Sequence, residues 1–229
     1  YNGTVKPGCT IVNDPVMGKC LQFDGTSGFV SLPAFSGVGD TDFLNGITIA
    51  AWVNADVLNN ACIIDLYTGS SNENISLQIG NGKPYAYVPT NGIASNTSIV
   101  EGGWYHFAVT LAPNGNAFFY INGRPTTVVA QISGITLGSP VYSSNAIGKG
   151  LAGNKSVGLF QGKLAWLSVY NTALTIDQVN ADMLKGEANR ISTFRKSLPV
   201  DFNLYSDNNT DHVPVLYIEQ EGDGKKLHL

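Results

Sequence analysis

The stretches MGKCLQFDGTSGFVSLP (17–33), ITIAAWVNAD (47–56) and GGWYHFAVTLAPNGNAFFYING (102–123) decide the fold of this chain. Each contains runs of apolar and β-branched residues, and segments rich in Gly, Pro and Asn separate these runs. Evenly spaced runs of this kind are typical of an antiparallel sheet protein with many chain reversals. We therefore predict an all-β domain.

The segment WYHFAV (104–109) shows the strand pattern most clearly. Trp104 and His106 fall on one face of an extended chain, whereas Phe107 and Val109 fall on the other. Side chains of an extended strand alternate between its two faces with a period of two residues, so only a strand places these alternate residues on one buried face. The segment is therefore predicted to be a strand. The turn sequence APNGN that follows combines Pro with Asn-Gly, which favours a β-hairpin.

One segment, residues 172–186, has helical rather than strand character. Thr175 can cap a helix, with Gln178 three residues later as the second half of a capping box. Gly186 is a stop signal. The apolar stripe of this helix consists of Val179, Met183 and Leu184. We predict one short helix near residues 175–185.

Several motifs in a fixed order make the chain resemble a known family. Between residues 16 and 184 the chain carries GKCLQFDGTSGFVSLP, ITIAAWVN, GGWYHFAVTL, FFYINGRP, IGKG and FQGKLAWLSVYNTALTIDQV. This order is similar to that of concanavalin A-like or laminin G-like jelly-roll domains, in which FDG, AWV, WYH and YVNG precede a closing GxIDEVxIYNxAL pattern. The resemblance implies a two-sheet antiparallel jelly-roll sandwich. It does not fix the function, because this fold serves lectins, enzymes, adhesins and structural modules.

The resemblance also suggests a division of the chain. We predict a laminin G-like jelly-roll domain over residues 1–190 and a β-rich C-terminal extension over residues 191–229. The segment VPVLYI (213–218) favours a strand, and Pro214 favours an edge or entering strand. The extension either adds one or two strands to the sandwich or pairs with a sheet edge of a neighbouring copy.

The composition excludes two classes of partner. Charged residues make up only 13% of the chain and the formal net charge is −4, so no basic surface is available to neutralise nucleic-acid phosphates. No run approaches the roughly 20 apolar residues that a membrane-spanning helix needs. We expect neither a nucleic-acid partner nor a membrane span.

The carboxylate pairs of hydrolytic jelly rolls are not found. Such enzymes carry an ExDxxE pattern along one strand, and the nearest match, Glu221-Gly-Asp223, has Lys226 in place of the second Glu. His106 alternates into a strand and is interpreted as a packed sheet histidine rather than a base. We predict no catalytic residues and no enzymatic activity.

Calcium is the one cofactor that the resemblance suggests. Ca²⁺ takes six to eight oxygen ligands, and Asp24, Asp40 and Asp42 lie near predicted strand ends, with Asp65 as a further candidate. Asp24 has an alternative role as a turn residue that accepts hydrogen bonds from backbone N–H groups. Residues 164–167 read Leu-Ala-Trp-Leu where relatives often read Ile-Asp-Glu-Val, which removes two possible ligands.

Carbohydrate recognition requires aromatic rings beside amide and hydroxyl groups. Several tyrosines lie in segments rich in Asn, Ser and Gly, and a tryptophan replaces a usual acidic residue of the closing pattern. The predicted ligand-binding residues are Tyr67, Tyr85, Tyr87, Asn91, Tyr142 and Trp166. The alternative is that alternating Tyr85 and Tyr87 simply suit the outer face of a strand.

Three cysteines leave the redox state open. Cys9 and Cys20 flank a short loop, and we predict a disulfide between them. The alternative is that Cys20 and Cys62 are small buried apolar residues.

Five Asn-X-Ser/Thr sequons stand against roughly three expected by chance. They lie at Asn2, Asn74, Asn96, Asn154 and Asn208. They predict surface loops, and they predict glycosylation if the source attaches N-glycans.

Two functions are consistent with these features. The first is an extracellular, non-catalytic recognition module, secreted or at the cell surface, that binds glycans or a cell-surface ligand or acts in adhesion. The second is a structural subunit of an extracellular filament or surface assembly, in which the C-terminal extension pairs with a neighbouring copy.

Overall fold

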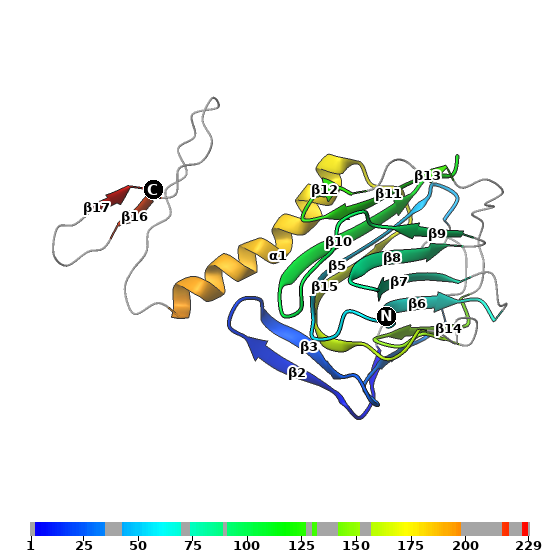
Figure 1. Cartoon of the computed structure of the whole chain (residues 1–229), viewed down its shortest axis with the longest axis horizontal. Helices are drawn as coiled ribbons and strands as arrows, with labels where there is room; N and C mark the ends of the chain where they lie inside the picture. Colours follow the sequence, from blue (N-terminus) through cyan, green and yellow to red (C-terminus); the bar gives the residue numbers. More distant parts are fainter. Residues whose placement is uncertain are drawn as a thin grey trace.

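The structure of the chain is a computed structural model. It describes residues 3–34, 43–69, 74–88, 91–126, 130–131, 142–151, 157–197, 217–219 and 226–228. Within them, two antiparallel sheets pack face to face, which confirms the predicted jelly-roll sandwich (Figure 1). The core lies between the two sheets.

Seven strands form the first sheet. From edge to edge they are β1 (Thr4–Val5), β4 (Val30–Leu32), β14 (Ser144–Ile147), β6 (Ala61–Tyr67), β7 (Ile75–Gly80), β8 (Lys83–Val88) and β9 (Asn91–Ala94). The second sheet follows the order β12 (Arg124–Pro125), β11 (Asn116–Ile121), β10 (Trp104–Leu111), β5 (Ile47–Ala55), β15 (Gln161–Tyr170), β3 (Gly18–Asp24) and β2 (Cys9–Asp14). An eighth strand, β13 (Ala130–Gln131), pairs with β11.

Strand β5 lies in the middle of the second sheet and is buried along its whole length. Ile49 and Val53 point into the core between the sheets. Trp52 points to the outer face, where it packs with Met183 of helix α1 (Ile176–Ser197). Because the helix covers this outer face, the strand can be apolar on both sides.

Strand β10 has the alternation that the sequence predicts. Phe107 is buried between the sheets, whereas His106 lies on the outer face with its ring centroid 5.5 Å from that of Trp52. The predicted hairpin connects β10 to β11, and the N–H of Ala112 donates to the carbonyl oxygen of Asn116 at 2.8 Å. The extended pattern and its turn are therefore both confirmed.

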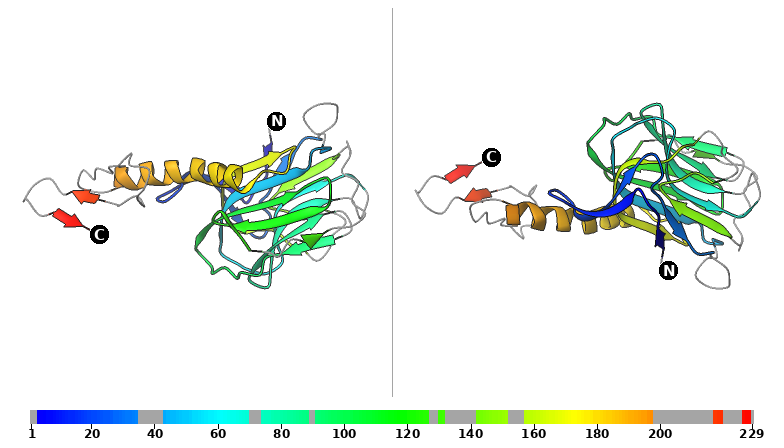
Figure 2. Two further views of the ribbon diagram at one scale, coloured as in Figure 1. Left: turned by 90° about the horizontal axis from the view of Figure 1, so that it is seen from above. Right: turned by 90° about the horizontal axis from the view of Figure 1, so that it is seen from below.

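Helix α1 begins as the sequence predicts. The N–H of Thr175 donates to Oε1 of Gln178 at 2.9 Å, and the N–H of Gln178 donates to Oγ1 of Thr175 at 3.3 Å, which forms the capping box. The predicted helix is therefore confirmed, but it continues through Gly186 to Ser197, beyond the predicted end near residue 185. Figure 2 shows the helix projecting beyond the sandwich.

No helix in the described part of the chain combines the length and apolar character needed to cross a membrane.

Gly186 serves packing rather than helix termination. A Cβ at this position would overlap the Trp52 indole and would lie 3.2 Å from Cδ1 of Trp166. The helix can approach these two rings closely because the residue has no side chain. The predicted apolar stripe needs one correction, since Val179 is fully buried but Leu184 is 54% exposed.

The described part of the C-terminal extension contains β16 (Tyr217–Glu219) and β17 (Lys226–His228), which pair antiparallel. Most of the predicted strand at 213–218 lies outside the described residues. The predicted domain boundary at residue 190 falls within the continuous helix α1. The division into two parts stays a prediction.

The predicted Cys9–Cys20 disulfide is wrong. In the ladder between β2 and β3, Cys9 lies opposite Phe23 and Cys20 lies opposite Val12. The two thiols therefore point to opposite faces of the sheet. All three cysteines, including Cys62, are free and buried, which confirms the alternative interpretation for Cys20 and Cys62.

Candidate functional site

One face of the seven-stranded sheet brings aromatic and polar side chains together. In β8, Ala86 and Val88 are buried in the core, and Tyr85 and Tyr87 therefore point to the outer face of the sheet. Both tyrosines are half-buried. Tyr85 and Tyr87 thus lie on the outer strand face, as the alternative interpretation predicts.

The neighbouring strand β7 adds polar groups to this face. Ser76 lies opposite Tyr87, and Gln78 lies opposite Tyr85. Nε2 of Gln78 donates to Oγ of Ser76 at 2.5 Å. The two tyrosines therefore stand beside an amide and a hydroxyl group that are both buried, 5% and 0% exposed.

Strand β6 contributes a third tyrosine. Asp65 opposes Ser76, and Tyr67 follows Asp65 by two residues, so its side chain has the same direction. Tyr67 is also half-buried. We define the tyrosine face as Tyr67, Ser76, Gln78, Tyr85 and Tyr87.

Gly92 on β9 determines how the ring of Tyr85 lies. A Cβ at residue 92 would overlap the phenol ring of Tyr85, so the ring lies over the glycine backbone. Burial, with a smaller contribution from Tyr87, raises the pKa of Tyr85 above its ordinary value. The hydroxyl is thus neutral at pH 7, and the ring packs on the backbone of Gly92.

Asp65 lies on the same face but is not accessible. Its side chain is fully buried, with Oδ1 accepting from Nδ2 of Asn74 at 3.1 Å and Oδ2 accepting from the N–H of Leu151 at 2.8 Å. Burial raises the pKa of Asp65, although the two hydrogen bonds oppose this effect. The carboxyl group therefore holds neighbouring segments together.

Asp24, the first predicted calcium ligand, is part of a turn. Its carboxylate accepts hydrogen bonds from the N–H groups of Thr26, Ser27 and Gly28 and from the hydroxyls of Thr26 and Ser27, at 2.7–2.9 Å. These bonds, led by that from Ser27, lower the pKa of Asp24. This is the arrangement that the turn interpretation predicts.

The other predicted calcium ligands, Asp40 and Asp42, lie outside the described residues. Within the described ranges, no three His, Cys, Asp or Glu side chains are grouped so that they could hold a metal ion. Calcium binding stays a prediction.

The remaining predicted ligand residues do not join the tyrosine face. Tyr142 is 2% exposed and packs edge-to-face on Phe43 with ring centroids 5.6 Å apart, so its predicted role in ligand binding is wrong. The backbone of Asn91 belongs to β9, and its side chain lies outside the described part. Trp166 is exposed, as a ligand role requires, but it lies on β15 of the other sheet.

The sequence interpretation missed a buried polar network that includes Asp182. Nε2 of His106 lies 3.4 Å from Oδ2 of Asp182, and the hydroxyl of Tyr170 donates to Oδ1 of Asp182. Nζ of Lys185 lies 3.1 Å from the Tyr170 hydroxyl. Burial alone would raise the pKa of Asp182, but its hydrogen bonds and the Lys185 charge lower it. His106 is fully buried, so this network attaches α1 to the sheet and offers no accessible base.

The sequons occupy different environments. Asn74 is 2% exposed, and its Nδ2 donates to Asp65, so the prediction that this sequon lies on the surface is wrong. Asn96 is exposed. Asn2, Asn154 and Asn208 lie outside the described residues.

The architecture defines an antiparallel jelly-roll domain with a mixed aromatic and polar sheet face. A laminin G-type family model, described as the concanavalin A-like lectin/glucanases superfamily, matches residues 24–180. The chain belongs to this superfamily. A comparison with curated proteins found no match.

Solved structures with the same fold include domain 4 of AbnA, a GH43 extracellular arabinanase from Geobacillus stearothermophilus, in complex with arabinotriose. That domain is 22% identical with a TM-score of 0.59, and the match covers 80% of this chain and 82% of that chain. The binding domain of Paraclostridial Mosquitocidal Protein 1 is 17% identical (TM-score 0.61; 80% and 47% covered). A protein from Bacteroides ovatus ATCC 8483 that is proposed to bind carbohydrate is 19% identical (TM-score 0.54; 80% and 48% covered). The chain spans about half the length of the last two structures.

Proposed function

We propose that the chain is a non-catalytic carbohydrate-binding module that works outside the cell and that the tyrosine face is its sugar site. The proposal agrees with the family, which contains lectins, and with the arabinotriose complex of domain 4 of AbnA. No step of covalent chemistry is needed. The partner is a glycan, free or on a cell surface.

The observation that carries the proposal is the placement of the Tyr85 ring over Gly92, beside Tyr87 and Gln78. A pyranose or furanose ring has an apolar C–H face that stacks on an aromatic ring, and its hydroxyls require hydrogen-bonding groups. A ring that is already packed against the backbone loses little entropy on binding. The phenol hydroxyls of Tyr85 and Tyr87 supply donors and acceptors, whereas Ser76 and Gln78 are buried and bonded to each other.

The test is a titration of the whole chain with arabinotriose, followed by a glycan array. We expect Tyr85→Ala and Tyr87→Ala each to weaken binding about tenfold or more, because stacking of a nucleobase on an aromatic side chain contributes about 1–3 kcal/mol and we expect the C–H face of a sugar ring to contribute comparably. Phe118→Ala is the matched control, since Phe118 is a half-buried aromatic residue of the other sheet. The site is wrong if a glycan binds equally to the parent and to both tyrosine variants, and the function is wrong if no glycan binds. Repeating the titration with Ca²⁺ and with a chelator tests the predicted cofactor.

The second function is that of a structural subunit that assembles through residues 191–229. The pairing of β16 with β17 supports it, because this pairing indicates that the extension forms strands. Light scattering of the whole chain and of a version ending at Ser197, which leaves α1 intact, tests it. If the whole chain assembles and the shortened version does not, the result would favour the structural subunit.

A further inference from the structure

Trp166 adopts an unusual backbone conformation. Its φ angle is 51°, in the left-handed region that bulky side chains rarely occupy. The residue lies in a β-bulge, where the register between β15 and β5 shifts between Ala165 and Ser168. Its large apolar side chain is nevertheless 46% exposed. Backbone strain of this kind persists where the surrounding structure imposes it, and it is often found at binding sites.

The strained residue borders a split in the eight-stranded sheet. The ladder between β3 and β15 ends at the pair Leu21 and Leu164. Beyond this pair β3 continues only with β2, as far as the pair of Gly18 and Asp14. A notch therefore opens between the first residues of β3 and the bulge of β15.

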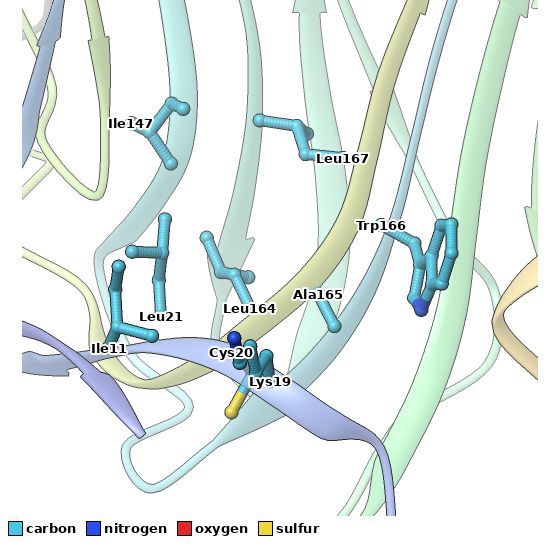
Figure 3. A pocket seen from close by; sticks show the side chains of 9 residues that line it. All are labelled: Ile11, Lys19, Cys20, Leu21, Ile147, Leu164, Ala165, Trp166 and Leu167. Atoms are coloured by element: carbon cyan, nitrogen blue, oxygen red, sulfur yellow. The ribbon is translucent and has the colours of Figure 1, made fainter. Parts of the chain in front are cut away.

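The notch is the mouth of an apolar groove of about 310 Å³ (Figure 3). Leu21 and Leu164 lie along it, with Ile147 from the opposite sheet. Ile11, the ladder partner of Leu21, is 69% exposed at one side, and Trp166 stands at the other. The volume falls at the lower end of the range for small-ligand sites, about 300–1,000 Å³.

The lining gives the chemistry of the occupant. Among the described lining residues, Lys19 carries the only charge, and no side chain offers a carboxylate or an amide. A sugar would leave its hydroxyls without partners there, which is costly. Lys19 forms no ion pair with any described residue, and it shares a face of β3 with Leu21. An apolar body with one anionic group fits both features.

We propose that this groove is a second binding site, independent of the tyrosine face, for a monomeric amphiphile with a hydrocarbon body and a carboxylate. The hydrocarbon lies between Trp166 and Ile11 over Leu164. The carboxylate faces the ammonium group of Lys19.

The test uses the whole chain and sodium decanoate below its micelle concentration, with calorimetry and tryptophan fluorescence as readouts. We expect saturable binding of one decanoate per chain and a shift in tryptophan emission. Trp166→Asn, which tolerates a positive φ, and Ile11→Ser should each weaken binding about tenfold or more. Lys19→Gln should weaken it about two- to fivefold, as an exposed charge does.

Matched controls make the outcome decisive. Val57→Ala removes an exposed apolar side chain outside the groove and should leave binding unchanged. Decyltrimethylammonium has a linear alkyl chain of similar length with the opposite charge and should bind more weakly than decanoate. Ile11→Ser keeps the proposal testable if Trp166→Asn fails to fold, because Ile11 is exposed. The proposal is overturned if decanoate does not bind, or if decyltrimethylammonium binds at least as tightly as decanoate. It is also overturned if the Ile11 and Val57 variants bind decanoate equally, or if the chain binds anionic phosphatidylserine vesicles but not monomeric decanoate.

Discussion

Gly186 of helix α1 lies directly against the indole of Trp52. The indole Nε1 donates to the carbonyl oxygen of Met183 at 3.2 Å, one turn before the glycine, and a Cβ at residue 186 would overlap the same indole. The helix therefore packs closely on the outer face of the eight-stranded sheet at Gly186, because glycine has no side chain. The contact also places α1 beside Trp166 and the apolar groove.

Gly186→Ala should destabilise the fold. Alanine favours a helix over glycine by about 1 kcal/mol, but forcing a methyl group against a buried ring typically costs about 1–3 kcal/mol. We expect a net loss of up to about 2 kcal/mol in the free energy of unfolding, measured by urea titration. Gly80→Ala is the control, because nothing lies within 4 Å of its added Cβ. A variant more stable than the parent would show that α1 does not pack as described.

This contact also shows what sequence reasoning could and could not predict. Strand alternation and the capping box are local, since each depends on side chains within a few residues, and both were predicted correctly. The sequence predicts a stop at Gly186, because a packing glycine and a capping glycine look alike in sequence. Only the position of Trp52, more than a hundred residues earlier, distinguishes them.

Asp182 should make stability depend on pH in the acid range. Its pKa is lowered in the folded state, so the folded chain binds fewer protons than the unfolded chain as the pH falls toward the ordinary value. The stabilisation is therefore complete above the unfolded pKa of about 4 and is lost as the pH falls through the lower folded pKa.

The measurement is a series of urea titrations between pH 6 and pH 2.5 on the parent and on Asp182→Asn. The variant should be less stable at pH 6, and the difference should shrink in acid, because the parent then also loses the ionised carboxylate. Asp177→Asn, which changes an exposed carboxylate of the same helix outside the network, is the matched control. A gap between parent and Asp182→Asn that stays constant with pH would contradict the role of the network.

The three thiols should be unreactive until the chain unfolds. Burial raises the pKa of Cys9, Cys20 and Cys62, so little reactive thiolate is present at pH 8. A thiol reagent should label close to no cysteines in native buffer and three in guanidinium chloride. Labelling of one thiol in denaturant would instead indicate a disulfide.

The predicted disulfide and the predicted ligand residues show a second limit on what can be predicted from the sequence. Whether Cys9 and Cys20 share a face depends on the β2–β3 register, and a shift of one residue reverses the answer. Tyr85 and Tyr142 have similar polar neighbours in sequence, yet one lies over Gly92 on an outer face and the other packs on Phe43. Three of the six predicted ligand residues, Tyr67, Tyr85 and Tyr87, share one face because β6, β7 and β8 are neighbours.

Expression in a cell that attaches N-glycans should modify Asn96 and not Asn74 in the folded product. A glycan is attached through Nδ2, and this atom of Asn74 is buried and bonded to Asp65, whereas Asn96 is exposed. A glycan at Asn74 would leave the buried Asp65 carboxyl without one of its two partners, so such chains should not reach the native state. Peptide mass spectrometry of the folded fraction, with Asn96→Gln as the control for site assignment, measures this. Native protein carrying a glycan at Asn74 would mean that Asp65 and Asn74 are not paired beneath the tyrosine face.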